Sequence, residues 1–180
     1  MTTKVCYNVF CIEKRDTVNN IKNEPKIKNP LLQAVRGQLE QRAQWLYLLC
    51  DEANKKWLEW EDFAPDAIRR CGLHQGNNLV LKGKTDSLKG LKRTLFNPPA
   101  QLVFEMKIKK SSDDELVIDF GYCPLVKGWQ KMGCSDEEIA RLCDIAMCGD
   151  RGIGQCYGAT LELPQCIAKG DNICRLRYKK

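Results

Sequence analysis

The 180-residue sequence has a single histidine, His74, and no apolar run near the roughly 18 residues that a membrane span needs. One histidine excludes any multi-histidine metal site and argues against a Ser-His-Asp arrangement. The N-terminal stretch MTTKVCYNVFCIEKRD also lacks the apolar segment and the small-residue cleavage site of a signal peptide. We therefore expect a cytoplasmic protein with no membrane partner.

Common cofactor motifs are missing as well. None of the 11 cysteines forms a C-x-x-C pair, the spacing typical of zinc ribbons and ferredoxins. The glycine-rich segment 151–160, RGIGQCYGAT, matches neither a dinucleotide-binding nor a P-loop pattern, and its composition predicts a mobile loop. The net charge of +6 comes without a basic and aromatic platform, so we expect no nucleic-acid partner.

Cysteine itself is abundant. An odd number of cysteines at irregular spacing, without a signal peptide, argues against a disulfide framework and predicts free thiols in a reducing compartment. Free cysteine also packs as a small hydrophobic residue, so burial in the core is the competing explanation for each thiol.

The first half of the chain is predicted to be helical. Asn29-Pro30 is a helix start signal, and the apolar spacing that follows predicts a long helix that reaches Trp57. Shorter helices are expected from Pro65 to Gly72 and from Asp86 to Phe96, where Asn97-Pro98 ends the last one.

The second half of the chain shows the alternation of β-strands. Apolar residues alternate over 102–108 and 116–120, and two further strands are expected at 160–167 and 173–178. The fold class is therefore α+β, with N-terminal helices packed on an antiparallel sheet made of two hairpins. We expect a single domain over 29–180, preceded by a polar N-terminal arm over 1–28.

A Cys-Pro strand-to-helix junction is the first candidate for chemistry. Pro124 suits the first helical position, which makes Cys123 the residue that caps the helix. Free N–H groups and the positive end of the helix dipole favour a thiolate there, so Cys123 is the candidate nucleophile. A second helix follows, with Ser135 and Glu138 spaced as a capping box, and it ends near Asp150.

Besides Asp150, one further acid, Asp119, and two basic residues, Arg36 and His74, are candidates for the site. Asp119 has the same parity as Cys123 along its strand, so either it faces the site or it is an ordinary surface residue. Arg36 on the first helix could hold a substrate carboxylate or belong to a solvated face, and His74 sits in a loop-like sequence.

Several short motifs together resemble the L-2-amino-thiazoline-4-carboxylate hydrolase family over roughly residues 29–178. They are Cys123-Pro124, Leu142-Cys143, Asp150 and the closing KGDNIC of residues 169–174. The resemblance implies a hydrolase that opens a cyclic amidine or thiazoline-type ring. The closing hairpin is also similar to the small-molecule-binding domains of the vinyl-reductase type.

Carried onto this sequence, the family pattern falls on Cys123, Cys143, Asp150, Asp171 and Cys174, and Asp119, Arg36 and His74 are added because of their own positions in the chain. The candidate catalytic residues are Cys123, Asp119, Asp150, Cys143 and Cys174, and the candidate substrate-binding residues are Asp171, Arg36 and His74. A thiolate would attack the amidine carbon, and a carboxylate would protonate the ring nitrogen or the leaving sulfur and then activate water. We expect no cofactor and a carboxylate-bearing or cyclic substrate, and a homo-oligomer is one expected form of the protein.

Two other functions stay open. In the first, Cys123, Cys143, Cys148 and Cys174 bind zinc or iron, with Asp150 as a further ligand. In the second, the cysteines are core residues of a domain that binds or senses a small molecule without turnover.

Overall fold

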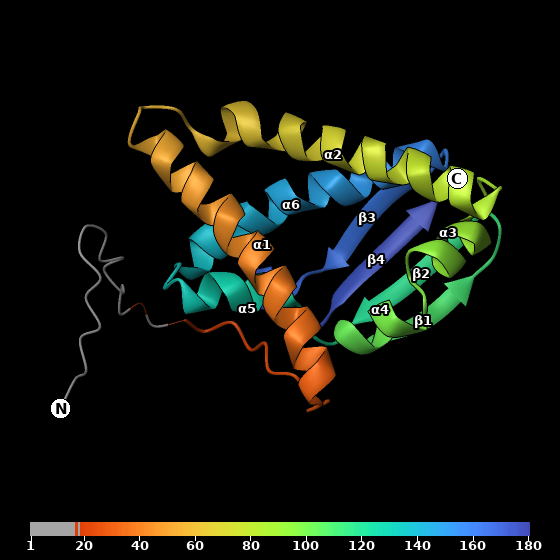
Figure 1. Ribbon diagram of the computed structural model, residues 1–180, viewed down its shortest axis with the longest axis horizontal. Coiled ribbons are helices and arrows are strands. Elements are labelled where there is room, and N and C mark those ends of the chain that lie inside the picture. Colours follow the sequence, from red (N-terminus) through yellow and green to blue (C-terminus); the bar gives the residue numbers. More distant parts are fainter. Residues whose placement is uncertain (1–16, 18) are drawn as a thin grey trace.

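The computed structural model describes residue 17 and residues 19–180, so the rest of the predicted N-terminal arm lies outside the described residues. Helices cover one face of a four-stranded antiparallel sheet with the strand order β1-β2-β4-β3 (Figure 1). This arrangement confirms the predicted α+β class, with the helices leading and two hairpins joined through β2 and β4. The helices are α1 (Pro30–Asn54), α2 (Trp60–Gly83), α3 (Leu88–Thr94), α4 (Pro98–Val103), α5 (Pro124–Lys131), α6 (Asp136–Cys156) and the 3-10 helix η1 (Ile167–Lys169). The strands are β1 (Met106–Ser111), β2 (Glu115–Phe120), β3 (Thr160–Gln165) and β4 (Cys174–Lys179).

An X-Pro pair starts three of the helices. The Asn29 side chain accepts hydrogen bonds from the N–H groups of Leu31 and Leu32 and so caps α1, as predicted. Asn97 caps α4 in the same way, through the N–H of Ala100. The prediction of a strand from residue 102 was therefore wrong at its start, because Asn97-Pro98 opens a new helix.

The second helix differs most from its prediction. It begins at Trp60, before Pro65, and Gly72 does not end it. A Cβ atom on Gly72 would lie 2.0 Å from the carbonyl oxygen of Gly149, so this glycine lets α2 and α6 touch backbone to backbone. Helix α6 likewise continues through the predicted glycine-rich loop, since Gly152 packs against the Arg69 carbonyl.

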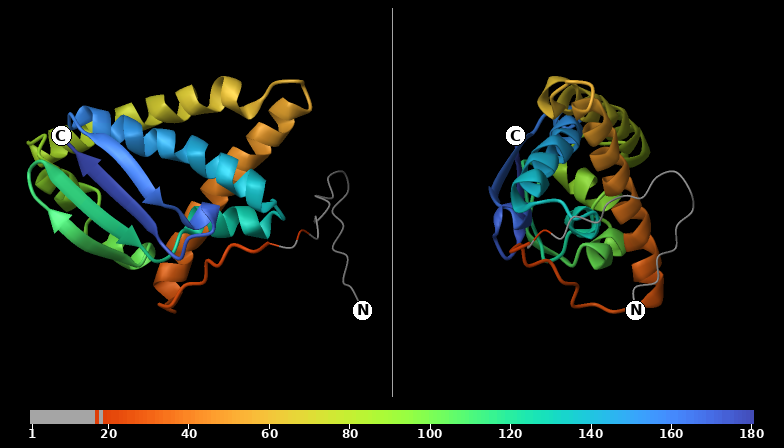
Figure 2. Two further views of the ribbon diagram at one scale, coloured as in Figure 1. Left: turned by 180° about the vertical axis from the view of Figure 1, so that it is seen from behind. Right: turned by 90° about the vertical axis from the view of Figure 1, so that its left-hand side faces the viewer.

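The two faces of the sheet have opposite chemistry. Leu116, Ile118, Leu176 and Tyr178 point into the core beneath the helices and are at most 3% exposed. The other face is not covered by helices, as the right-hand view of Figure 2 shows. Ion pairs link β2 and β4 across that outer face, which matches the alternation expected of a sheet with one buried side.

The described part of the N-terminal arm lies extended beside α5. The Asn23 side chain accepts a hydrogen bond from the Cys123 N–H at 2.9 Å and donates one to the Cys123 carbonyl at 2.8 Å. Glu24 forms an ion pair with Lys127 on α5. This segment is thus fixed to the Cys-Pro junction. None of the described helices is long and apolar enough to cross a membrane.

Candidate functional site

Four thiols from separate parts of the chain converge beneath the sheet. The sulfur atoms of Cys143 on α6 and Cys166 before η1 are 3.6 Å apart. Cys166 also accepts a hydrogen bond from the thiol of Cys174 on β4, and the charge of Cys166 acts on Cys123. Three of these cysteines were predicted as site residues, and they do meet in space.

Cys166 is the acidic thiol of this cluster. Its pKa lies far below the ordinary value because the Cys143 and Cys174 thiols donate hydrogen bonds to it. The N–H groups of Ala168 and Lys169, at the start of η1, add to the effect. Those same hydrogen bonds and the mutual repulsion of the thiols raise the pKa of Cys143 and Cys174.

The KGDNIC segment holds η1 in place. The Asp171 carboxylate accepts a hydrogen bond from the Cys166 N–H at 2.7 Å, and the Cys174 sulfur accepts one from the Ile167 N–H at 3.2 Å. Asp171 therefore orients the backbone at Cys166. The Asp171 residue itself is exposed at the surface. Sequence reasoning missed Cys166, although a cysteine between a strand and a short helical turn repeats the arrangement at Cys123.

Cys123 caps α5 as predicted, but it is not an acidic thiol. The nearby N–H groups of Val126 and Leu125 lower its pKa, as expected at a helix N-terminus. Burial outweighs them and, with the charges of Cys166 and Asp150, raises the pKa to about 11. Cys123 is half-buried, whereas Cys143, Cys166 and Cys174 are buried, so it is the most accessible thiol of the four.

Asp150 on α6 is a carboxylate whose negative charge raises the pKa of Cys123. Burial raises its pKa to about 6, and Arg42, Arg151 and Tyr178 each lower it by a smaller amount. The Tyr178 hydroxyl is buried and faces the Asp150 carboxylate, although the two lie farther apart than in an ordinary hydrogen bond. An acid with a pKa near neutrality can both donate and accept a proton at physiological pH.

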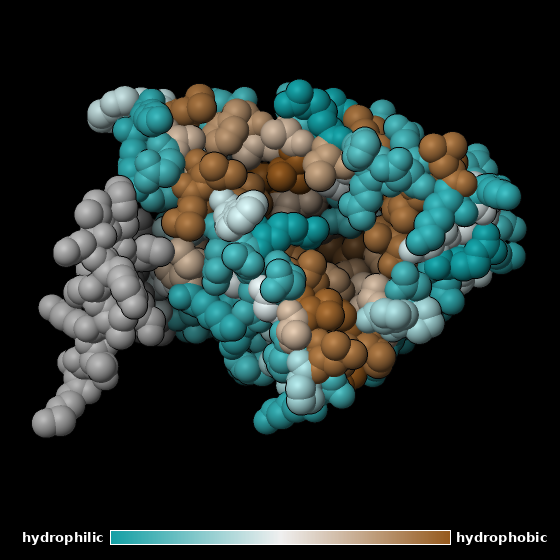
Figure 3. All heavy atoms as spheres, viewed as in Figure 1, coloured by the Kyte–Doolittle hydropathy of each residue, from teal (hydrophilic) through white to brown (hydrophobic). Residues whose placement is uncertain are grey.

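The face that carries α1 is hollowed. Figure 3 shows the depression between α1, α2 and the short helices α3 and α4, in front of the sheet, with apolar residues around it. Arg42 on α1 lies on this side of the molecule close enough to act on Asp150. Cys123 and Asp150 are both half-buried.

The remaining predicted acid is not brought to Cys123. Both oxygens of Asp119 accept hydrogen bonds from Arg175, at 2.6 and 2.8 Å, and this lowers the pKa of the carboxyl. The pair lies across β2 and β4 on the outer face of the sheet. Strand β2 ends at Phe120, so its alternation does not continue to Cys123, which packs against the core.

The predicted basic residues lie elsewhere too. Arg36 is fully buried, stacks on the Tyr122 ring and donates to Glu105 and to three backbone carbonyl oxygens, so it braces α1 against α4. His74 is exposed on α2, not in a loop, and pairs with Asn78. Cys148 contacts Asp144 and Arg151 at the surface of α6.

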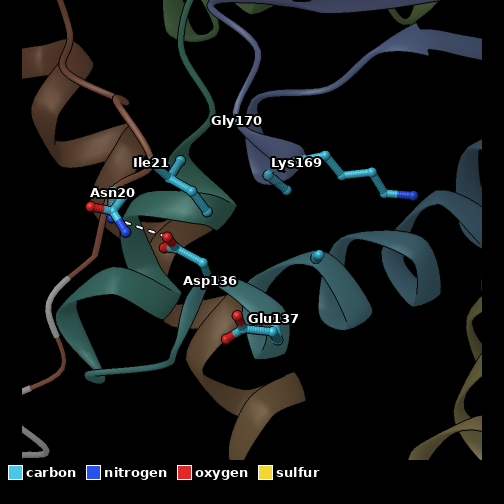
Figure 4. Close-up of a pocket in the computed structure, with 8 residues that line it drawn as sticks. Asn20, Ile21, Asp136, Glu137, Lys169 and Gly170 are labelled. Atoms are coloured by element: carbon cyan, nitrogen blue, oxygen red, sulfur yellow. Dashed lines mark hydrogen bonds between the residues drawn. The ribbon is translucent and has the colours of Figure 1, made fainter.

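A shallow pocket of about 300 Å³ lies on the outer side of η1 (Figure 4). Asp136 and Glu137 from the start of α6 line it, and the Asp136 carboxylate accepts a hydrogen bond from the Asn20 N–H. The Lys169 side chain extends away from these acids and pairs with Asp144. The ammonium group of Lys169, the basic residue that lines the pocket, is thus engaged by Asp144.

Among residue 17 and residues 19–180, no group of three or more His, Cys, Asp or Glu side chains has the arrangement of a metal site. The thiols of Cys143, Cys166 and Cys174 satisfy one another with hydrogen bonds instead. Zinc or iron binding stays a prediction that metal analysis can test.

One known family matches most of the chain. The sequence profile described as L-2-amino-thiazoline-4-carboxylic acid hydrolase matches residues 38–178. No curated protein matches the chain. Among solved structures, trafficking protein particle complex subunit 3 from Naegleria fowleri, covalently bound to palmitic acid, has a TM-score of 0.50 and 13% sequence identity, covering 79% of this chain and 94% of that chain. At that identity the likeness concerns the fold alone. Because the profile spans most of the chain and includes the thiol cluster and Asp150, this protein belongs to the L-2-amino-thiazoline-4-carboxylic acid hydrolase family.

Proposed function

We propose that this protein opens a small cyclic amidine, of the 2-amino-thiazoline-4-carboxylate type, by breaking a ring carbon–nitrogen bond. The observation that carries the proposal is that a half-buried thiol, Cys123, lies within the electrostatic range of an acid of near-neutral pKa, Asp150. Nucleophilic catalysis needs such a pair, because a thiol of high pKa requires a nearby base. The family to which the chain belongs supports the substrate class.

The proposed reaction has two stages. In the first, Asp150 takes the Cys123 proton as the sulfur adds to the amidine carbon, and the same proton then passes to the ring nitrogen as the carbon–nitrogen bond breaks. In the second, Asp150 takes a proton from water as the oxygen adds to that carbon, and Cys123 leaves with this proton. The net change is the addition of one water molecule.

The free energies allow this sequence. Moving a proton from a thiol of pKa about 11 to a carboxyl of pKa about 6 costs about 7 kcal/mol. A typical turnover of about 10 per second corresponds to a barrier of about 16 kcal/mol, so the transfer fits within it. A cationic amidinium bound beside Cys123 lowers the cost further, because an opposite charge favours the thiolate.

Arg42 is the proposed anchor for the substrate carboxylate. It acts on Asp150 from α1 and lies at the surface, whereas Arg36 is fully committed to the fold. A guanidinium can hold a carboxylate through two hydrogen bonds. Arg42→Gln should therefore raise KM for the carboxylate substrate and leave KM for the unsubstituted 2-amino-thiazoline unchanged.

The direct test is an assay of the purified protein with L-2-amino-thiazoline-4-carboxylate, with loss of the ring chromophore as the readout. The proposal predicts ring opening that continues after extensive dialysis against a chelator. Loss of activity on dialysis, with recovery on adding zinc or iron, would favour a metal-dependent hydrolase. Tight binding without ring opening, across a set of cyclic amidines, would instead identify a ligand-binding domain.

The binding-domain alternative has one specific observation in its favour. The structurally similar trafficking subunit holds palmitic acid covalently, and this chain has a half-buried thiol below a face with exposed apolar residues. A thioester between Cys123 and a fatty acid would appear as an added mass on the protein purified from cells, and hydroxylamine would remove it.

A further inference from the structure

The outward face of α1 is apolar although none of the described residues covers it. Leu31, Val35, Trp45 and Leu49 are 74, 42, 65 and 66% exposed. Their spacing places them on one side of the helix, opposite the buried side that contains Arg36, Ala43 and Tyr47. Figure 3 shows apolar patches over both ends of α1, with a hydrophilic band between them. Exposed apolar patches that are flanked by polar residues mark interaction sites.

The outward residues of α1 form a stripe whose sequence of side-chain types is nearly symmetric about its centre. Its positions are 31, 35, 38, 42, 45 and 49, which alternate steps of four and three residues as in a helix that packs along another helix. Residues 31 and 49, 35 and 45, and 38 and 42 form three pairs, and the two members of each pair are equally far from residue 40 along the sequence. A twofold axis at that point therefore matches Leu31 with Leu49, Val35 with Trp45, and Gln38 with Arg42 of a second copy.

Only the antiparallel arrangement is chemically complementary. There the Arg42 guanidinium meets the Gln38 amide oxygen, the small Val35 side chain meets the large Trp45 ring, and leucine meets leucine at both ends. A parallel pair would set Arg42 against Arg42 and Trp45 against Trp45. Antiparallel helices also oppose their dipoles, which is the more favourable arrangement.

The area is sufficient for a weak or moderate dimer. An aromatic side chain such as Trp45 buries roughly 150–250 Å². Together with the three smaller aliphatic side chains, and at the exposed fractions given above, the stripe offers about 500 Å² of apolar area per copy. Two copies then bury on the order of 1,000 Å² before the flanking polar residues are counted, which reaches the range of specific interfaces.

We infer that α1 is a homodimer interface, in which two copies of this chain pair antiparallel about residue 40. The occupant of the stripe is a second copy because the pattern is complementary to itself. Arg42 lies next to the twofold axis of this interface, and the five N–H donors of its guanidinium suffice to bind both Gln38 of the second copy and the proposed substrate carboxylate. This inference does not depend on the proposed hydrolase activity.

The test is the mass of the full chain in solution, measured by light scattering or sedimentation at increasing concentration. The wild type should be dimeric at tens of micromolar. Trp45→Glu should weaken the dimer at least 100-fold, because it puts a charge into an apolar contact. Leu81→Glu is the matched control, since Leu81 on α2 is also 74% exposed but lies outside the stripe, and it should leave the dimer intact.

A charge exchange tests the register. Gln38→Lys should weaken the dimer by placing an ammonium group against the Arg42 guanidinium, and Arg42→Glu added to it should restore the dimer through ion pairs across the axis. A wild-type monomer at all concentrations, or a dimer indifferent to Trp45→Glu, would overturn the inference. So would a monomer that binds anionic lipid vesicles through the stripe, because the occupant would then be a membrane.

Discussion

Cys123 and Cys166 both cap a helical turn after a strand, and yet their thiols differ widely in acidity. Near each sulfur, two backbone N–H groups at the start of the turn lower the pKa of the thiol. Cys123 nevertheless has a pKa raised to about 11, whereas the pKa of Cys166 is strongly lowered. Two thiols donate hydrogen bonds to Cys166 and lower its pKa. Burial raises the pKa of Cys123 most, and the negative charges of Cys166 and Asp150 add to that effect.

A helix N-terminus therefore does not make a cysteine acidic by itself. Burial and nearby charge decide which thiol carries the negative charge, and here they place it on a thiol less accessible than Cys123. The accessible thiol is protonated and depends on a base. This division predicts that Cys166 sets the electrostatics of the site while Cys123, assisted by Asp150, performs the chemistry.

The largest expected effect is that of removing the Cys123 sulfur. Cys123→Ser should reduce kcat at least about 10³-fold, because serine is a far weaker nucleophile and Asp150 is not basic enough to activate it. Cys71→Ser, at an exposed cysteine on α2, is the matched control and should retain full activity. Equal activity of the two variants would remove Cys123 from the mechanism.

Replacing the base should have the next largest effect. Asp150→Asn should lower kcat about 10²- to 10⁴-fold, the range for loss of a general acid or base. In the wild type, activity should rise with pH through about 6, as the Asp150 carboxyl ionises. A pH–rate profile of kcat/KM without that limb would contradict the role of Asp150.

The same variant should gain stability. Because burial raises the pKa of Asp150 from 3.8 to about 6, the folded state binds the proton more tightly. Asp150 therefore stabilises the fold below pH 4 relative to neutral pH, and that contribution is lost as pH rises through about 6. Asp150→Asn should then raise the free energy of unfolding at pH 7.5 by about 1–3 kcal/mol. Urea unfolding at pH 4.5 and 7.5 measures the change, and a gain that is equal at both pH values would exclude this cause.

A smaller effect tests the electrostatic link between the two cysteines. Cys166→Ser removes the charge that helps raise the pKa of Cys123, so Cys123 should react faster with iodoacetamide at pH 8. We expect an increase of about 3- to 10-fold, because a lower pKa raises the fraction of the thiol that is present as reactive thiolate at pH 8. Mass spectrometry of the peptide that contains Cys123 gives the rate, and Cys134→Ser, at another buried cysteine, is the control. An unchanged rate would show that the charge of Cys166 does not raise the pKa of Cys123.

The smallest effect is expected at Asp119. Its pKa is lowered by Arg175, so the pair stabilises the fold above pH 4 and that contribution is lost as pH falls through the lowered pKa. Asp119→Asn should cost about 0.5–1 kcal/mol at pH 7, as for a partly exposed ion pair. Turnover should change less than twofold. A large loss of kcat would show that Asp119 takes part in the reaction after all.

Local signals in the sequence predicted much of this architecture. Asn29-Pro30, Cys123-Pro124 and the Ser135 capping box each start a helix, because caps act within one turn of the chain. The course of α2 was not predictable in the same way. Its glycines are explained only by their contact with α6, about 80 residues later in the sequence.

The site was predicted less completely for a similar reason. Cys143, Cys174 and Asp150 were found from motifs, but Cys166 becomes acidic only when strand β4 and helix α6 bring two thiols to it. Asn23 holds the Cys123 backbone from a segment 100 residues away. The parity of Asp119 along its strand was misleading, because the strand ends before Cys123.

The most direct test of the central claim is mass spectrometry of Asp150→Asn protein quenched during reaction with L-2-amino-thiazoline-4-carboxylate. Loss of Asp150 slows both stages, but water is a far weaker nucleophile than a thiol, so the second stage slows more and a covalent adduct should accumulate on the peptide that contains Cys123 and on no other cysteine. An adduct on Cys166, or turnover by Cys123→Ser with no adduct at any thiol, would contradict the assignment of Cys123 as the nucleophile.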